Sequence, residues 1–286
     1  MKSEPGAKIL IVGLGLLGGS YAAALTQKGF CVGAIDTDAE AIRYARSEGI
    51  IAHGACVPED EYVGQFDLVV FALYPHILIE WLEHYQKFLK PGALLTDVTG
   101  VKCSVVYRLQ SILRPDVEFI GAHPMAGREV SGVRNATAEL FRGANYIVTP
   151  TEKNTEAAVC RCEELGRLIG CSHISRLSPE QHDEMIGFLS QLTHCIAVAL
   201  MTCKDSTHLA EYTGDSFRDL TRIGKINETM WCELFLANRE KLIAQMDVFL
   251  DKMHAMRKAL CDSDSDTLKQ MMRLSTERRK CFDKKV

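Results

Sequence analysis

The stretch AKILIVGLGLLG, residues 7–18, decides the fold of this 286-residue chain. It is an apolar run that reaches Gly13, continues through Gly15 and Gly18, and leads directly into the helical pattern LGGSYAAALTQKG. A strand, the spacing G-x-G-x-x-G and a helix form the turn that holds the pyrophosphate of a dinucleotide at the helix N-terminus. Gly13 permits the tight turn, Gly15 leaves room for the phosphates, and Gly18 lets the helix pack closely on the strand. The alternative is a structural turn that binds no nucleotide.

The acidic residue at the end of the second predicted strand indicates which dinucleotide binds. Asp36 closes the run FCVGAID, about twenty residues beyond the loop. A carboxylate here accepts hydrogen bonds from ribose hydroxyls and repels a 2′-phosphate, and no arginine stands at Thr37 or Asp38 to bind that phosphate. The sequence therefore favours NAD over NADP, unless Asp36 only caps the next helix. The cofactor-binding candidates lie in the loop and at strand ends: Gly13, Gly15, Leu16, Leu17, Gly18, Asp36, Leu73 and Thr99.

Apolar strands alternate with helical segments in the first half of the chain. Strand-like runs cover residues 7–13, 30–36, 66–73, 93–98, 117–124 and 144–150, and helical patterns cover residues 17–29, 38–49, 75–90 and 101–113. Strands that are apolar throughout are typical of a parallel sheet covered by helices on both faces. We therefore predict an α/β Rossmann-type fold with a doubly wound parallel sheet.

The pattern changes at Pro179, after which we find only helical periodicity. Long helices are predicted over residues 179–204, 228–260 and 265–282. We therefore expect an NAD-binding Rossmann domain over residues 1–178 and a helical domain for substrate binding and dimerisation over residues 179–286. The apolar faces of these helices are too extensive for a monomer of this size to cover, which predicts a homodimer.

Composition narrows the partners and the location of the protein. The net charge of −4 gives no reason to expect nucleic acid or an anionic membrane as a partner. Eleven cysteines without metal-type spacing, behind a start that lacks the apolar region of a signal peptide, predict reduced thiols, no metal site and a cytoplasmic location. The longest apolar segment, residues 187–203, includes Gln191 and His194, so we expect a buried helix rather than a membrane span.

A histidine stands at the end of the predicted strand over residues 117–124. Pro124 restricts His123 to extended geometry. The strand end places it beside Leu73 and Thr99, at the sheet edge where ligands of such folds bind. With an ordinary pKa of about 6.5, an imidazole can accept a hydroxyl proton as hydride leaves the same carbon. The alternative is a histidine that only caps a buried turn.

Several longer motifs resemble the prephenate and arogenate dehydrogenases of tyrosine biosynthesis. They are GLGLLGGS (13–20), DVTGVK (97–102), HPMAGREVSG (123–132), LSPEQHDEMIGFLSQLTH (177–194) and FRDLTRI (217–223), in the order and spacing of that family. The similarity covers nearly the whole chain. HPMAG and P-E-x-H-D are its specific parts, because many dehydrogenases share the glycine loop.

The resemblance implies a concrete reaction. Members of the family oxidatively decarboxylate a cyclohexadienol: hydride leaves the carbinol carbon for NAD⁺, the ring carboxylate departs as CO₂ and the ring becomes aromatic. By resemblance, His123 accepts the proton of the ring hydroxyl and Arg222 binds a substrate carboxylate, which suits a planar and permanently charged guanidinium. His182 corresponds to a histidine near the cofactor and the domain junction, where it acts either in the chemistry or only in the interdomain contact.

The chain also departs from the family pattern at two places. Many members have a serine, whose hydroxyl contacts the catalytic histidine, where this chain has Gly100. Either Thr99 or a water then supplies that hydroxyl. Many bacterial members have a second pocket histidine where this chain has Gln191, beside Ser190, and both are candidates for substrate binding. A glutamine can donate and accept hydrogen bonds but carries no charge.

An acidic residue bears on which substrate is preferred. Prephenate carries a keto acid and arogenate an amino acid, so a carboxylate in the pocket would pair with the ammonium of arogenate and oppose prephenate. Asp215, in EYTGDSFRD, resembles the acidic position of plant-type arogenate enzymes, whereas RDLTRI resembles bacterial prephenate enzymes. Asp215 is alternatively a turn residue or helix cap after Gly214.

Two other functions compete with a prephenate or arogenate dehydrogenase. A β-hydroxyacid dehydrogenase or imine reductase has the same domain types but usually carries a catalytic lysine or aspartate on the interdomain helix, where this chain has Gln191 and His194. A nucleotide-sensing protein without catalysis is compatible with Gly100 and Gln191. The presence of both His123 and Arg222 argues against such a protein.

Overall fold

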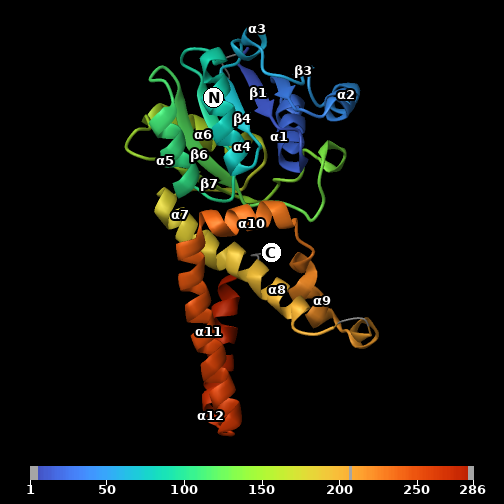
Figure 1. The fold of residues 1–286 in the computed structure, drawn as a ribbon, viewed down its shortest axis with the longest axis vertical. Helices are drawn as coiled ribbons and strands as arrows, with labels where there is room; N and C mark the ends of the chain where they lie inside the picture. The colour runs from blue at the N-terminus through green and yellow to red at the C-terminus, as the bar shows by residue number, and fades with distance from the viewer. Residues whose placement is uncertain (1–5, 206–207, 283–286) are drawn as a thin grey trace. The chain divides into compact units, whose positions relative to one another are not determined.

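A computed structural model describes residues 6–205 and 208–282 of the chain. The chain divides into two compact units, residues 1–238 and residues 239–286. The first unit contains the sheet and the helices around it (Figure 1). The described part of the second unit, residues 239–282, forms two helices and a short 3₁₀ turn.

The first unit is built on one eight-stranded sheet with the order β3-β2-β1-β4-β5-β6-β7-β8. The strands are β1 (Lys8–Val12), β2 (Cys31–Ile35), β3 (His53–Ala55), β4 (Leu68–Phe71), β5 (Leu94–Asp97), β6 (Glu118–Pro124), β7 (Asn145–Thr149) and β8 (His173–Arg176). All neighbours pair in parallel except β6 and β7. The chain order reverses direction between β3 and β4, which makes β1 and β4 the pair where ligands of such sheets bind.

Helices cover both faces of this sheet (Figure 1). They are α1 (Leu16–Gln27), α2 (Ala39–Ser47), α3 (Asp60–Val63), α4 (Pro75–Tyr85), α5 (Cys103–Ile112) and α6 (Glu156–Leu168), with 3₁₀ turns η1 (Gln86–Phe88) and η2 (Val133–Asn135). Alternate residues of β1 enter different cores: Ile9 and Ile11 pack with α1, α2 and α6, whereas Leu10 and Val12 pack with α3, α4 and α5. Burial on both faces explains why the central strands are apolar throughout.

The predicted Rossmann-type doubly wound fold is confirmed, with two strands missed and one direction wrong. Strands β3 and β8 are short and partly exposed, so they lack the apolar run by which the other six were recognised. Strand β7 is antiparallel to β6, with His123 opposite Ile147. A parallel neighbour needs a crossover connection, usually a helix, and between these strands the chain forms only the turn η2.

The rest of the first unit is helical. It comprises α7 (Pro179–Ile186), the π-helical segment η3 (Gly187–Leu192), α8 (Thr193–Thr202), η4 (Leu209–Tyr212), α9 (Asp215–Thr221), η5 (Arg222–Gly224) and α10 (Glu228–Ala237). The continuous helix Pro179–Thr202 is, by length and composition alone, apolar enough to cross a membrane, as core helices of water-soluble proteins also are. Within the most apolar 18 residues of this helix, only 28% are buried inside the structure. The expectation of a buried helix is therefore met in part.

The helix predicted over residues 228–260 is in fact two helices. It breaks at Asn238, whose φ of −118° leaves the helical region. The Asn238 side chain donates hydrogen bonds to the carbonyl oxygen of Asp183 and to Oε1 of Gln191, which hold the backbone at the break. A periodic pattern carries no signal for such a contact.

The second unit begins directly after this break. It contains α11 (Arg239–Cys261), α12 (Ser265–Arg279) and η6 (Lys280–Phe282), and α11 packs against α12. The helix predicted over residues 265–282 is therefore confirmed, and no strand follows Pro179 within residues 179–205 and 208–282. The domain division at residue 178 stays a prediction.

Replacing Gly18 with alanine should destabilise the first unit. A Cβ on Gly18 would lie 1.8 Å from the carbonyl oxygen of Gly13 and 3.0 Å from Cβ of Ala72, so the backbone would have to shift. We expect the free energy of unfolding to fall by about 1–3 kcal/mol in urea denaturation. Gly15→Ala is the matched control, because its Cβ would meet nothing within 4 Å. Equal stabilities of the two variants would contradict this packing role of Gly18.

Candidate active site

The glycine loop has the geometry of a phosphate cradle. The amide of Gly13 donates to the carbonyl of Ile35 at 2.8 Å, and its φ of +96° is a conformation that favours glycine. Gly15 is the N-cap of α1 and has no side-chain cap, so the first amides of the helix face outward without a partner from a capping side chain. A Cβ on Gly15 would enter open space, which is the space that the pyrophosphate of a dinucleotide needs. The loop therefore fits the predicted cofactor.

Asp36 lies directly beyond β2 and faces the glycine loop. Its Oδ2 accepts a hydrogen bond from the amide of Leu14 at 2.6 Å, and its Oδ1 accepts one from the amide of Asp38 at 2.8 Å. The N-cap of α2 is Asp38, which accepts from the amide of Glu40. Capping of α2 is thus performed by Asp38, and each oxygen of Asp36 retains a lone pair for a ribose hydroxyl.

The other cofactor candidates lie at the carboxyl edge of the same sheet. Leu73 follows β4, and its Cδ2 lies 3.0 Å from where a Cβ on Gly13 would be, so it contacts the glycine loop. Thr99 follows β5 and is buried. Leu16 and Leu17 form the first turn of α1. Their contact with a cofactor stays a prediction.

His123 is the penultimate residue of β6 and is only partly buried. It lies inside the strand rather than on an exposed turn, because β7 continues to pair with this end of β6. The preceding amide, that of Ala122, donates to Oδ1 of Asp97 at 3.0 Å. The backbone that carries the imidazole is therefore held from both sides.

A buried ion pair lies next to this strand end. Nζ of Lys102 is 2.6 Å from Oδ2 of Asp97, and both side chains are inaccessible to solvent. The same carboxylate oxygen accepts from the hydroxyl of Thr99, which is also within reach of the carbonyl of Val101 at 2.9 Å and of Nζ of Lys102 at 3.2 Å. The Thr99 hydroxyl is therefore used within this cluster and does not contact His123. The catalytic and cofactor-binding roles expected of Thr99 stay predictions.

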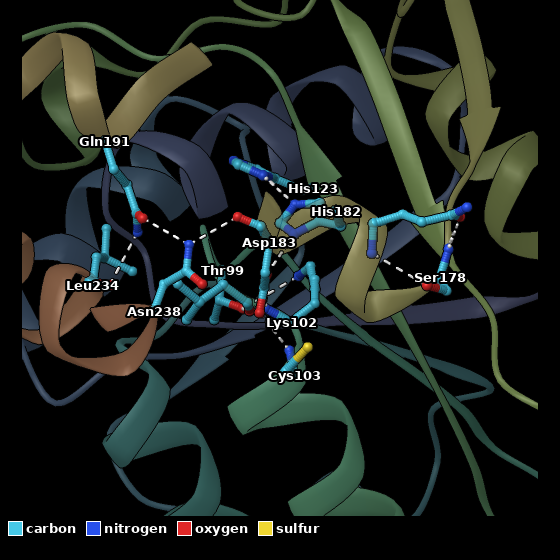
Figure 2. Close-up of polar contacts among 12 residues, drawn as sticks. Thr99, Lys102, Cys103, His123, Ser178, His182, Asp183, Gln191, Leu234 and Asn238 are labelled. Atoms are coloured by element: carbon cyan, nitrogen blue, oxygen red, sulfur yellow. Dashed lines mark hydrogen bonds and ion pairs between the residues drawn. The ribbon is translucent and has the colours of Figure 1, made fainter. Parts of the chain in front are cut away.

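The position of Gly100 shows what its substitution changes. A Cβ at Gly100 would lie 4.0 Å from Cε1 of His123 and 3.5 Å from two methyl groups of Leu234. A serine at this position would therefore stand next to the imidazole. In this chain the partner of the imidazole is another residue: Nδ1 of His123 lies 2.9 Å from Nε2 of His182 (Figure 2).

Helix α7 presents His182 and Asp183 from its second turn. Ser178 and Gln181 form a capping box at its start, with Pro179 in the first turn, and these signals fix where the helix begins. Nδ1 of His182 lies 2.8 Å from Oδ1 of Asp183. The Asp183 carboxylate also accepts from the amides of Lys102 and Cys103, each at 2.8 Å, at the N-terminus of α5 (Figure 2).

Burial and neighbouring charges set the ionisation of these groups. Burial lowers the pKa of His123 well below 6.5, and the nearby His182 and Lys102 lower it further. Burial also lowers the pKa of His182, although Asp183 opposes that shift. Burial alone would raise the pKa of Asp183, but hydrogen bonds from His182 and from the Cys103 amide outweigh it and keep the pKa below its usual value. Both imidazoles are therefore neutral near pH 7 and Asp183 is a carboxylate.

Gln191 joins two helices rather than pointing freely into a pocket. Its Nε2 donates to the carbonyl of Leu234 at 3.0 Å, and its Oε1 accepts from Nδ2 of Asn238 at 2.7 Å (Figure 2). Its side chain is buried. Ser190 lies beside it on η3, and its carbonyl accepts from Nδ1 of His194 at 2.8 Å. A direct contact of Gln191 or Ser190 with substrate stays a prediction.

Arg222 pairs with a residue of the loop that follows His123. Its Nη1 forms an ion pair with Oε1 of Glu129, although 65% of the Arg222 side chain is exposed. His194 lies in the field of both charges and stacks on Trp231 with ring centroids 3.7 Å apart. A guanidinium, a carboxylate and two aromatic rings therefore gather where α8, α10 and this loop meet.

Asp215 is placed differently from these residues. It lies in the first turn of α9 with its side chain 94% exposed, 3.6 Å from Nη1 of Arg218. This is the position of a residue that stabilises a helix N-terminus. Its role as a substrate ligand stays a prediction.

Several residues of the site were not singled out from the sequence. Asp97 and Lys102 lie in the quoted motif DVTGVK, Asp183 in P-E-x-H-D, and Glu129 in HPMAGREVSG. The motifs therefore contain these residues, but they do not tell which residue pairs with which partner. No group of three or more metal-ligating side chains occurs among the described residues.

The fold and the site together define a class: a Rossmann-type dinucleotide-binding dehydrogenase with a helical C-terminal region. The family model of the prephenate dehydrogenase nucleotide-binding domain matches residues 21–173, and that of the prephenate dehydrogenase dimerization domain matches residues 178–274. The chain belongs to the prephenate dehydrogenase family.

Individual relatives agree with this assignment. The chain is 31% identical to prephenate dehydrogenase of Bacillus subtilis over 91% of its own length and 72% of that protein. It is 29% identical to cyclohexadienyl dehydrogenase of Zymomonas mobilis, over 95% and 94% of the two chains. The crystal structure of prephenate dehydrogenase from A. aeolicus, in complex with hydroxyphenyl propionate and NAD⁺, superposes with a TM-score of 0.89 at 29% identity, covering 98% and 100%. A β-hydroxyacid dehydrogenase or imine reductase is therefore the wrong alternative.

Replacing Asp36 with alanine should weaken NAD⁺ binding and relax discrimination against NADP⁺. The change removes a charged acceptor for ribose hydroxyls and the negative charge that repels a 2′-phosphate, so the Kd for NAD⁺ should rise roughly 10- to 100-fold. Isothermal titration calorimetry with both dinucleotides measures this. Asp38→Ala is the matched control, because it removes only the cap of α2. Equal losses in the two variants would make Asp36 a structural residue.

Proposed function

We propose that the protein catalyses the NAD-dependent oxidative decarboxylation of a cyclohexadienol. The substrate is prephenate, which gives 4-hydroxyphenylpyruvate, or arogenate, which gives tyrosine, and the reaction belongs to tyrosine biosynthesis. The observation that carries this proposal is the position of His123 at the end of β6, with an imidazole that burial keeps neutral, in a chain of the prephenate dehydrogenase family.

His123 is the proton acceptor of the reaction. A neutral imidazole can take the ring hydroxyl proton without first losing one of its own. Its lowered pKa keeps it neutral at physiological pH. NAD⁺, when bound, takes the hydride from the carbinol carbon. The carboxylate then leaves as CO₂ and the ring becomes aromatic. His182 lies 2.9 Å from His123, which supports a role in positioning the base.

Arg222 binds a substrate carboxylate. Its guanidinium is largely exposed and pairs with one carboxylate, that of Glu129, which supports a role in binding an anion. A substrate carboxylate would compete with Glu129 for the same group. The neighbouring His194 and Trp231 offer a flat surface for the substrate ring.

The choice between prephenate and arogenate depends on Asp215 and Gln191. An ammonium partner is needed for arogenate, and Asp215 is the acidic candidate. The high exposure of the Asp215 side chain in the single chain supports the alternative, in which Asp215 only stabilises the first turn of α9. The buried Gln191 would act on the substrate only through its remaining amide hydrogen and lone pair.

We further propose a homodimer and a cytoplasmic location. The match to a dimerization domain over residues 178–274 supports the dimer. So do large apolar side chains that the chain leaves exposed on its long apolar helix: Met185, Phe188, Leu189 and Met201. Burial of His182, Asp183 and Gln191 on that helix supports packing against protein rather than lipid. We expect neither nucleic acid nor a membrane as a partner.

The test is a steady-state assay of NADH formation with prephenate and, separately, arogenate. Wild-type protein should turn over at least one of them, and His123→Asn should lower kcat by roughly 10²- to 10⁴-fold while NAD⁺ still binds. His53→Asn, a change of an exposed histidine on β3, is the control and should leave kcat unchanged.

The outcomes separate the alternatives. No turnover of either compound would leave the nucleotide-sensing alternative. Full activity of His123→Asn would remove His123 as the base. A higher kcat/KM for arogenate would support Asp215 as the ammonium partner, whereas a preference for prephenate would return it to a helix-end residue.

Replacing Arg222 with alanine should mainly raise KM for the cyclohexadienol. The loss of a charge-assisted hydrogen bond to the carboxylate should increase KM by roughly 10- to 100-fold, with a smaller change in kcat. Initial-rate kinetics at saturating NAD⁺ measure this. Arg218→Ala is the matched control, because Arg218 is an exposed arginine of the adjacent helix that pairs with Asp215. An unchanged KM in Arg222→Ala would remove Arg222 from the carboxylate site.

A further inference from the structure

Three side chains, those of Asp183, His182 and His123, form a continuous series of hydrogen bonds that ends at the base. Asp183 Oδ1 lies 2.8 Å from Nδ1 of His182, and Nε2 of His182 lies 2.9 Å from Nδ1 of His123. Asp183 and His182 come from α7, whereas His123 comes from β6, so this hydrogen-bonded series joins the helical region to the sheet (Figure 2). The outer nitrogen of the second imidazole, Nε2 of His123, has no partner among the described residues and remains for a substrate.

The direction of these hydrogen bonds follows from the chemistry of the groups. A carboxylate can only accept, so Nδ1 of His182 carries a hydrogen and donates it to Asp183. A neutral imidazole has one N–H, so Nε2 of His182 is an acceptor and Nδ1 of His123 must donate to it. Nε2 of His123 is then left without a hydrogen. This is the form that a general base requires.

The neighbouring groups keep Asp183 ionised and both imidazoles neutral. Asp183 stays ionised because the amides of Lys102 and Cys103 and the imidazole of His182 all donate to it. Lys102 lies close enough to both imidazoles to disfavour a positive charge on either, while Asp97 and Asp183 act on His182 in the opposite direction. On the α10 side, the group that faces this region is the apolar side chain of Leu234, next to Gly100.

We propose that Asp183 is the positioning residue of this enzyme: through His182 it fixes the Nδ1–H tautomer of His123 and so leaves Nε2 free to accept the substrate proton. The inference rests on the proposed function, in which His123 is the base. It also accounts for Gly100, because the histidine pair orients the base in a chain that has no hydroxyl at that position.

Direct observation of the tautomer is the first test. Nine histidines occur in the sequence, so ¹⁵N-histidine-labelled protein with NAD⁺ bound gives a tractable NMR spectrum, in which loss of signals in His123→Asn assigns that ring. We expect Nδ1 of His123 to be protonated and Nε2 not. A neutral imidazole in water prefers the opposite tautomer, so the result discriminates. An Nε2–H tautomer in wild-type protein would overturn the proposal, and only the assignment of the signals needs the His123→Asn variant.

The second test is Asp183→Asn in the full chain. The amide offers one oxygen to three N–H donors that the carboxylate satisfies, so His182 is no longer held in one tautomer. We expect kcat to fall by roughly 10²- to 10⁴-fold, with KM and the Kd for NAD⁺ within about threefold of wild type, and the His123 signals to shift. Asp67→Asn is the matched control, because Asp67 accepts from the Lys8 amide and from Lys90 but contacts no histidine.

Together, kcat and the His123 NMR signals of Asp183→Asn decide for or against the proposal. A kcat within about threefold of wild type overturns it, and so does a loss of kcat with unchanged His123 signals, which would mean a structural role. Absence of turnover in wild-type protein would refute the proposed function instead, while the NMR experiment would still report the tautomer.

Discussion

The Asp183 carboxylate is the contact on which the arrangement of the site depends. It satisfies two amides at the N-terminus of α5 and the imidazole of His182, while the carbonyl of the same residue accepts from Asn238. Helix α5 packs on the sheet, whereas His182 and Asn238 belong to the helical region. One residue thus connects the Rossmann portion to the helices that complete the site. A negative charge at a helix N-terminus is also favoured by the helix dipole.

A second buried electrostatic contact of the site is the ion pair of Asp97 and Lys102. Burying two charges is costly unless they pair closely and their remaining hydrogen-bonding groups find partners. Here Asp97 also accepts from Ala122 and Thr99, so both of its oxygens have hydrogen-bond donors. Removing one member of such a pair typically costs about 3–5 kcal/mol. Asp97 of this pair also holds the amide that precedes His123, and Lys102 places a positive charge that opposes protonation of the base.

Only part of the site was readable from the sequence. The glycine loop, Asp36 and the strand-end position of His123 were predicted because each follows from a local pattern of neighbouring residues. The Thr99 hydroxyl, which the sequence suggested as a partner of His123, donates to Asp97, and Gln191 links two helices. No local pattern tells a side chain which of several partners it will meet.

The sequence by itself determined the alternation of apolar strands and amphipathic helices, the order of the elements and the dinucleotide loop, because these depend on residues close together in the chain. The tertiary structure decided the antiparallel pairing of β7, the break at Asn238 and the chain from Asp183 to His123. The contacts that create them join residues far apart, 59 positions between His123 and His182 and 93 between Glu129 and Arg222. Their hydrogen bonds form only when packing brings distant segments together and removes the competing water.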